Sequence, residues 1–201
     1  MTTLFGSELP VQDVASDGML TPYTLGVRFR PMVNGTISHV SWVIPTVAQP
    51  TDGVNDGSVT FALFRDSTES VLGQTSLSTL GHEGTKLQVA MPSPIAVVAG
   101  QSYTAAIFTP EKYVFTSGYV WPHESSDGLL VSDSPGCYFD GEWELRYPTF
   151  TFGNSNYFVD VVFTASSAGP ALTVWAGTAE VLATVSIWTG TAEIPASLDI
   201  A

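Results

Sequence analysis

The chain has 201 residues, of which 44% are hydrophobic and only 12% are charged, so it can bury a core and is not intrinsically disordered. Six Lys and Arg stand against 19 Asp and Glu, which gives a formal net charge of −13. An acidic surface repels phosphate backbones and anionic lipids. We therefore expect neither nucleic acid nor a membrane as a partner.

The first strand signals follow an N-terminal stretch, residues 1–22, that we expect to form an irregular arm. Leu25, Val27 and Phe29 alternate with Gly and Arg, which predicts a half-buried strand. The pair Asn34-Gly35 then predicts a hairpin turn, because both residue types tolerate a positive φ.

The next strand carries Val40, Trp42 and Ile44 on one face. Ile37 is out of phase with these positions, which predicts a β-bulge. Later strands show the same alternation, at Val59, Phe61, Leu63, Leu87, Val89, Met91, Tyr103, Ala105 and Ile107. Eighteen Gly and 13 Pro separate these short runs, as is typical of a sandwich or barrel.

The fold class predicted from this pattern is all-β, an antiparallel β-sandwich of jelly-roll type with a C-terminal β-repeat appendage. We divide the chain into an N-terminal arm (1–22), the sandwich (23–165), a linker (166–171) and a tandem tail (172–201). The core is predicted to contain Trp42, Phe61, Val89, Tyr103 and Val161. Asp160 interrupts an apolar strand and needs a partner, for which we expect Arg28 or Arg30.

The C-terminal tail repeats itself. Leu172–Val181 reads LTVWAGTAEV, and VSIWTGTAEI begins 13 residues later at Val185, with a third start at Leu198. A short unit of this kind does not bury its own apolar face and needs another copy, a host domain or another subunit. We expect subunit contacts through the recurring positions, although both hairpins folding back onto their own sandwich is the alternative. The recurring positions are Val174, Trp175, Glu180, Ile187, Trp188, Glu193 and Ile200.

The segment 119–152 combines aromatic rings with carboxylates. Such rings stack on sugars, so a site for a glycan or another partner is one interpretation, and packing under a long loop is the other. The residues of the candidate site are Trp121, Tyr138, Trp143 and Tyr147. The carboxylates of the same segment could serve as an acid and a nucleophile in glycoside hydrolysis; they are Glu124, Asp133, Asp140, Glu142 and Glu144. We expect Glu142 and Glu144 to lie in solvent or at a subunit contact, without a second carboxylate across a pocket.

Other chemistry is weakly supported by the sequence. Cys137 is the only cysteine, and we expect it to be a buried filler rather than a nucleophile. His82-Glu83 lacks the second His of a zinc protease motif, and Val54 breaks the calcium-loop spacing in residues 52–57. We therefore predict no catalytic residue, no metal site and no cofactor.

Four stretches together resemble a β-sandwich family of unassigned function that occurs as modules in bacterial secreted and surface proteins and in phage virion proteins. These are TLGVRFR (24–30) with the following NG, ALFRDS (62–67), PIAVVAGQSY (94–103) and NYFVDVVFT (156–164). The resemblance covers roughly residues 20–165. Separately, the WxGTAE units of the tail resemble the C-terminal ends of minor tail proteins of phages that infect actinobacteria.

These resemblances imply a structural protein rather than an enzyme. The N-terminus lacks a basic region and an apolar stretch of the secretory type, so we expect assembly in the host cytoplasm and localisation in the virion. The expected function is that of a minor tail component, at the tail tip or in a fibre, whose partners are other virion proteins and copies of itself. A capsid decoration protein and a carbohydrate-binding module for host recognition are the alternatives.

Overall fold

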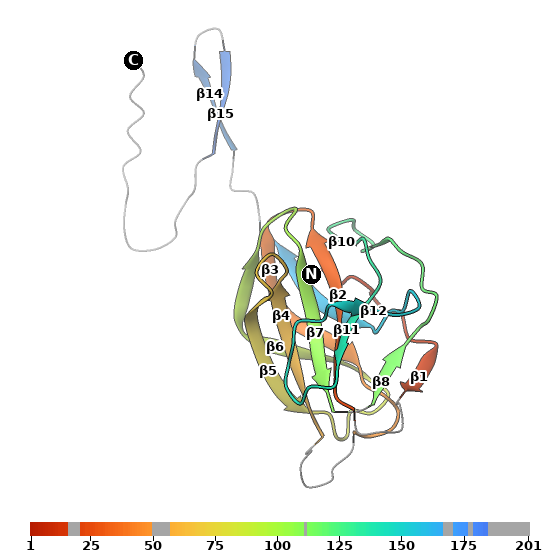
Figure 1. Ribbon diagram of the computed structural model, residues 1–201. Helices are drawn as coiled ribbons and strands as arrows, with labels where there is room; N and C mark the ends of the chain where they lie inside the picture. Colours follow the sequence, from red (N-terminus) through yellow and green to blue (C-terminus); the bar gives the residue numbers. More distant parts are fainter. Residues whose placement is uncertain (16–20, 50–56, 111, 167–170, 177–178, 185–201) are drawn as a thin grey trace. The chain divides into compact units, whose positions relative to one another are not determined.

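The computed structural model describes residues 1–15, 21–49, 57–110, 112–166, 171–176 and 179–184 (Figure 1). Every regular element in these ranges is a β-strand, so the predicted all-β class is confirmed. The same residues include no helix of the length and apolarity that a membrane crossing requires. The chain divides into two compact units, Met1–Ser166 and Ser167–Ala201, which are described separately.

The larger sheet of the first unit has the strand order β12-β11-β2-β7-β4-β5, with β10 pairing to β2 and β9 pairing to β10. All its pairings are antiparallel, and Figure 1 shows β5, β4, β7 and β2 lying side by side. Its strands are β2 (Tyr23–Pro31), β4 (Ser58–Arg65), β5 (Ser70–Ser78), β7 (Tyr103–Thr109), β9 (His123–Glu124), β10 (Leu130–Ser132), β11 (Cys137–Asp140) and β12 (Phe150–Thr151).

The smaller sheet has only three strands, in the order β13-β3-β6. These strands are β3 (Gly35–Val43), β6 (Lys86–Val97) and β13 (Val159–Ala165), and a separate ribbon pairs β1 (Gln12–Ala15) with β8 (Tyr113–Phe115). β13 packs against β2 and β7, and β3 packs against β4 and β7. The strands β11 and β12 therefore continue the larger sheet past the edge of the smaller one.

The predicted core is confirmed at all five positions. Trp42, Phe61, Tyr103 and Val161 are fully buried, and Val89 is 8% exposed. The pairing of β3 with β6 shifts register between Ile37 and His39, as the predicted bulge requires. Period-2 alternation was therefore sufficient to place the inner face of these strands.

The prediction of a hairpin at Asn34-Gly35 is wrong. β2 and β3 belong to different sheets, so the chain crosses from one layer of the sandwich to the other at this point. A Cβ on residue 35 would collide with the Phe163 ring and the Thr164 carbonyl oxygen. The Asn34 side chain stabilises this connection between the sheets, because its Oδ1 accepts a hydrogen bond of 2.8 Å from the Ala99 amide.

The first residues are part of the sandwich rather than a free arm. Thr2 exchanges two backbone hydrogen bonds of 2.8 Å with Phe163 of β13. Leu4 and Phe5 are each only 2% exposed and belong to the main hydrophobic core. An irregular arm therefore does not describe residues 2–5, because Thr2 pairs with β13 and the side chains of Leu4 and Phe5 pack in the core.

Asp160 fixes this N-terminal segment. Its carboxylate is fully buried and accepts hydrogen bonds from the amides of Leu4 (2.7 Å) and Phe5 (3.2 Å). Lys86 Nζ of β6 lies 2.9 Å from Asp160 Oδ2 and donates a second hydrogen bond, of 2.7 Å, to the Gly6 carbonyl oxygen. The buried charge is thus paired and hydrogen-bonded, as burial of a carboxylate demands.

The partner predicted for Asp160 is wrong. Arg28 lies 3.2 Å from Asp66, and Arg30 lies 2.6 Å from Asp133. Both arginines alternate with the inward-facing apolar residues of β2, so they project from the outer face of the larger sheet. Asp160 belongs to the opposite sheet, and its side chain points away from that face.

The second unit contains a two-stranded hairpin of β14 (Ala171–Ala176) and β15 (Ala179–Thr184). Its register pairs Val174 with Val181 and Trp175 with Glu180. The paired residues run from Ala171, one residue before the repeat start at Leu172, to Thr184, one residue before the next start at Val185. One 13-residue unit of the sequence therefore corresponds to one hairpin.

Phe61→Ala is expected to lower the free energy of unfolding of the sandwich by about 3–5 kcal/mol, through lost transfer energy and the cavity left behind. Urea denaturation followed by tryptophan fluorescence measures this change. Phe152→Ala is the matched control, because that ring is 65% exposed and its loss is expected to cost within about 0.5 kcal/mol. A cost below about 1 kcal/mol for Phe61→Ala would contradict the assigned core.

Lys86→Met is expected to destabilise the sandwich by about 3 kcal/mol, because it leaves the Asp160 carboxylate buried without its cation. Adding Asp160→Asn removes that charge and is expected to recover part of the loss in a double-mutant cycle. Arg65→Met is the control, since Arg65 is exposed. Strict additivity of the Lys86 and Asp160 substitutions would show that the pair is not coupled.

Candidate functional site

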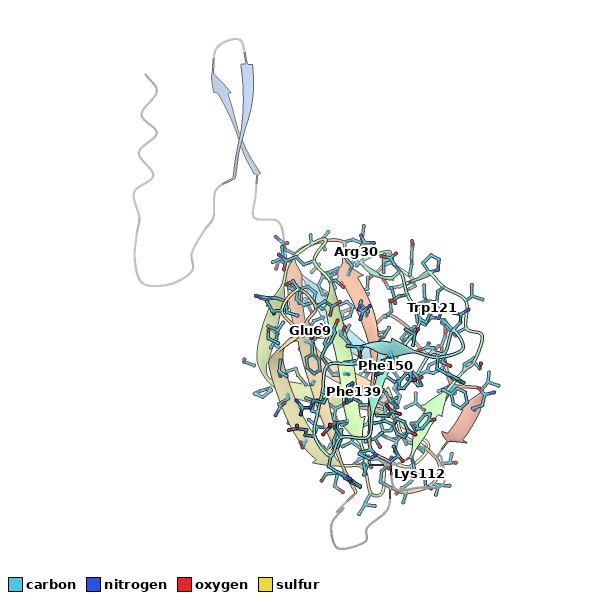
Figure 2. The ribbon with its side chains drawn as sticks, viewed as in Figure 1. Arg30, Glu69, Lys112, Trp121, Phe139 and Phe150 are labelled. Atoms are coloured by element: carbon cyan, nitrogen blue, oxygen red, sulfur yellow. The ribbon has the colours of Figure 1, made fainter. Side chains whose placement is uncertain are left out.

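The four aromatic residues predicted to form one binding surface lie in different surroundings. Trp121 packs in a cluster of rings, Tyr138 lines a pocket, Trp143 is 53% exposed and Tyr147 lies against the outer face of the larger sheet. In Figure 2, Trp121 is well separated from the stacked pair Phe139 and Phe150 on β11 and β12. The four residues therefore do not form a single platform.

Tyr147 has a structural environment. Its hydroxyl accepts a hydrogen bond of 3.2 Å from Arg28 Nη2, and the guanidinium carbon lies 5.9 Å from the ring centroid. The ring edge packs on Phe64, with centroids 5.6 Å apart. Asp66 completes the cluster by accepting a hydrogen bond of 2.7 Å from Thr104 Oγ1. These contacts position the 142–150 segment across the sheet.

Trp121 belongs to the contacts that hold the N-terminal segment. Its ring centroid lies 6.2 Å from that of Phe5 and 5.0 Å from that of Tyr119. The Tyr119 hydroxyl donates a hydrogen bond to Glu8, and burial, reinforced by Glu8, raises the pKa of this phenol. His123 Nε2 lies 3.1 Å from the Leu4 carbonyl oxygen. This cluster therefore continues the anchoring that Asp160 begins.

A cavity of about 280 Å³ opens beside the same segment. It is lined by Glu8, His123, Glu124 and Asp127 together with residues 1–6. Glu8, Glu124 and Asp127 contribute carboxylates to this lining. However, no three His, Cys, Asp or Glu side chains in the described part of the chain are arranged to hold a metal ion.

An aromatic pocket of about 210 Å³ lies where β11 extends past the smaller sheet. The β11–β2 register pairs Tyr138 with Leu25 and Asp140 with Tyr23. Because paired residues point to the same face of a sheet, these side chains lie on the inner face beyond the cover of β13. We call this site the tyrosine pocket; it is lined by Tyr23, Leu25, Tyr113, Tyr138, Asp140, Phe152 and Tyr157.

The tyrosine pocket has a buried floor and an exposed rim. Tyr23 and Tyr157 are each 5% exposed, whereas Asp140 and Phe152 are exposed. The rings of Tyr23 and Tyr113 are 5.1 Å apart at 59°, and those of Tyr113 and Tyr157 are 6.1 Å apart at 70°. The aromatic walls therefore meet at steep angles.

Burial raises the pKa of the Tyr157 phenol, and the neighbouring phenols of Tyr113 and Tyr138 raise this pKa further. Cys137 is buried on the other face of β11, and burial raises the pKa of its thiol to about 12. A thiol with such a pKa stays protonated at neutral pH, so Cys137 is an inert filler, as expected from the sequence.

Glu142 and Glu144 lie at the surface of the domain. Glu142 and Glu144 are both exposed, and Glu144 forms an ion pair with Arg146. Neither residue lines the tyrosine pocket or the cavity beside the N-terminal segment.

The predicted interface residues of the tail are placed only in part. Val174 and Trp175 lie on β14 and Glu180 lies on β15. Ile187, Trp188, Glu193 and Ile200 lie outside the described residues. So do residues 52–56 of the stretch in which Val54 breaks the calcium-loop spacing.

A family model described as "Domain of unknown function (DUF4082)" matches residues 8–159. The chain belongs to this family. The expected membership of a family of unassigned function is thus confirmed, and the match begins before the residue 20 at which the resemblance was placed. No curated protein matches the chain. Every residue lining the tyrosine pocket lies within the DUF4082 domain.

Sequence reasoning singled out Tyr138, and Asp140 and Phe152 lie in the same aromatic and acidic segment, but it missed the pocket residues outside that segment. Tyr23, Tyr113 and Tyr157 of the DUF4082 domain come from β2, β8 and the segment before β13. The signal available was the phase of β2 and β13, which places Tyr23 with the core-facing Leu25 and Val27.

Proposed function

We propose that the chain is a structural component of a phage virion, a minor tail protein of the tail tip or a fibre, that acts through subunit contacts. The observation that carries the proposal is the hairpin formed by one unit of the tandem repeat. In the described part of the chain, β14 and β15 pair only with each other. Both hairpin edges thus offer backbone groups to further strands.

The energetics of such a hairpin favour assembly. A two-stranded hairpin is marginally stable in water, and three or more strands or a packing surface are needed to stabilise it. Repeats that stack against their neighbours gain this stability from each added copy. The second copy carries Trp188 and Glu193 at the positions of Trp175 and Glu180, so it offers the same contacts again.

Two further points support localisation in the virion. The tail units resemble the C-terminal ends of minor tail proteins of phages that infect actinobacteria, and the net charge of −13 disfavours nucleic acid and anionic lipid as partners. The proposed partners are copies of the chain and other virion proteins. A capsid decoration protein would use the same contacts at a different place in the particle.

Truncation after Ser167 is expected to leave the sandwich folded and to abolish oligomerisation or incorporation into particles. The first unit keeps its core, whereas the repeat that supplies the open strand edges is lost. Sedimentation velocity measures assembly, and thermal unfolding measures the fold. Trp175→Ala combined with Trp188→Ala is expected to weaken assembly, while the exposed Trp143→Ala is the control. Normal assembly of the truncated chain would contradict the proposal.

A carbohydrate-binding module for a host cell-surface glycan is the second candidate. It is favoured by three exposed rings within one segment, since Trp143 is 53%, Phe150 51% and Phe152 65% exposed. Exposed aromatic rings of this size are suited to stacking on sugars. This function would add host recognition to the structural role and requires no catalysis.

If the module binds glycan, the purified chain is expected to be retained on host cell-wall polysaccharide, and Trp143→Ala is expected to reduce retention by removing an exposed stacking surface. Trp121→Ala is the comparison, because Trp121 packs against Phe5. Retention that survives Trp143→Ala would count against this candidate. Release of soluble sugars that Glu142→Gln or Glu144→Gln abolishes would instead indicate an enzyme.

A further inference from the structure

We propose that the tyrosine pocket binds a compact organic cation, an alkylated ammonium group of the trimethylammonium type. The described residues that line the pocket all belong to the first unit, so the inference does not rest on the proposed virion role. The argument uses the charge, the wall geometry and the layered burial of the pocket.

The charge of the lining favours a cation. Among the described residues that line the pocket there is no Lys, Arg or His, and the one ionisable acid is Asp140 at the rim. The π faces of tyrosine and phenylalanine carry negative potential, which attracts cations placed over them. The net charge of −13 on the chain also disfavours an anionic ligand.

The wall geometry favours a compact group over a flat one. Tyr23, Tyr113 and Tyr157 all line the pocket. The Tyr23 and Tyr113 rings are inclined at 59° and those of Tyr113 and Tyr157 at 70°, so the aromatic lining is not flat. A sugar ring stacks best on one open aromatic face, whereas a tetrahedral ammonium contacts several inclined faces at once. The volume of about 210 Å³ is below the 300 Å³ or more that drug-sized ligands occupy.

The layered burial matches the two parts of such a ligand. Tyr157 and Leu25 form a dry floor that suits the methyl groups of an alkylated ammonium. Asp140 is exposed at the mouth, where its carboxylate faces the charge without being desolvated itself. A cation in this position gains contact with the rings while the acid retains its hydration.

The test uses the full chain and choline as the probe, with calorimetry and aromatic NMR resonances as readouts. Choline is expected to bind and to shift the tyrosine signals, and its neutral isostere, with carbon in place of nitrogen, is expected to bind at least tenfold more weakly, as about one cation–π contact requires. Equal binding of the isostere, binding of a neutral monosaccharide in place of choline, or no binding of choline would overturn the proposal.

Two matched pairs of variants assign the contact. Asp140→Asn is expected to weaken choline binding by about tenfold, as for a partly solvated charge pair, while Glu142→Gln removes an equally exposed charge two residues away and leaves binding unchanged. Phe152→Leu keeps an apolar rim but removes a ring, so it is expected to weaken binding, whereas Trp143→Leu is not. Indifference of binding to both Asp140→Asn and Phe152→Leu would place the cation elsewhere and overturn the assignment.

A second titration distinguishes the sources of this group. A short peptide containing trimethyl-lysine presents the same cation on a protein, and choline presents it as a small headgroup. Tighter binding of either probe supports the site and identifies the source. Unmethylated lysine peptide binding as tightly as the methylated one would overturn the requirement for an alkylated ammonium.

Discussion

The inner face of the larger sheet is wider than the three strands packed against it, and this mismatch dictates much of the domain. β13 covers β2 and β7, but β11 and β12 extend past it. An apolar sheet face left in water loses the main stabilisation of the fold. Tyr113 of β8 and Tyr157 before β13 supply part of the cover over Tyr23, and the tyrosine pocket is the space that this irregular cover leaves open.

The segment from Asn156 to Asp160 joins the parts that this arrangement brings together. The Asn156 side chain is fully buried, and its Oδ1 accepts a hydrogen bond of 2.8 Å from the Phe158 amide. Phe158 has a φ of 56°, a strained conformation for a bulky residue, and its ring packs on Phe5. Tyr157 faces the pocket and Asp160 binds the N-terminal segment. Neighbouring positions of this segment thus contact different surfaces.

The sequence was enough to predict the features that depend on local pattern, such as which face of a strand is buried. It was not enough to predict the features that depend on which sheet each strand joins. Alternation was enough to bury Phe61 and Val161, because a strand with one apolar face has only one phase that hides it. Asp160 alternates with the core-facing Val159 and Val161, so the same phase places it on the other face of β13. Its burial there depends on the N-terminal segment and on Lys86 of β6, which are adjacent to it only in three dimensions. Asn34-Gly35 marks a reversal of direction equally well in a hairpin and in a crossing between sheets. The tyrosine pocket is formed by segments far apart in the chain, so no local sequence pattern predicts it.

Both ends of the sandwich meet on β13, and this has a consequence for how the protein is made. Thr2 pairs with Phe163, and the amides of Leu4 and Phe5 donate hydrogen bonds to Asp160. The first residues to be synthesised therefore form their native contacts with residues that are among the last of the domain. Contacts of such long sequence separation slow folding, since the loop must close before the contact forms. During translation, residues 2–5 remain without their native partners until β13 has left the ribosome. The domain therefore completes its core in one late step, after its whole length has emerged.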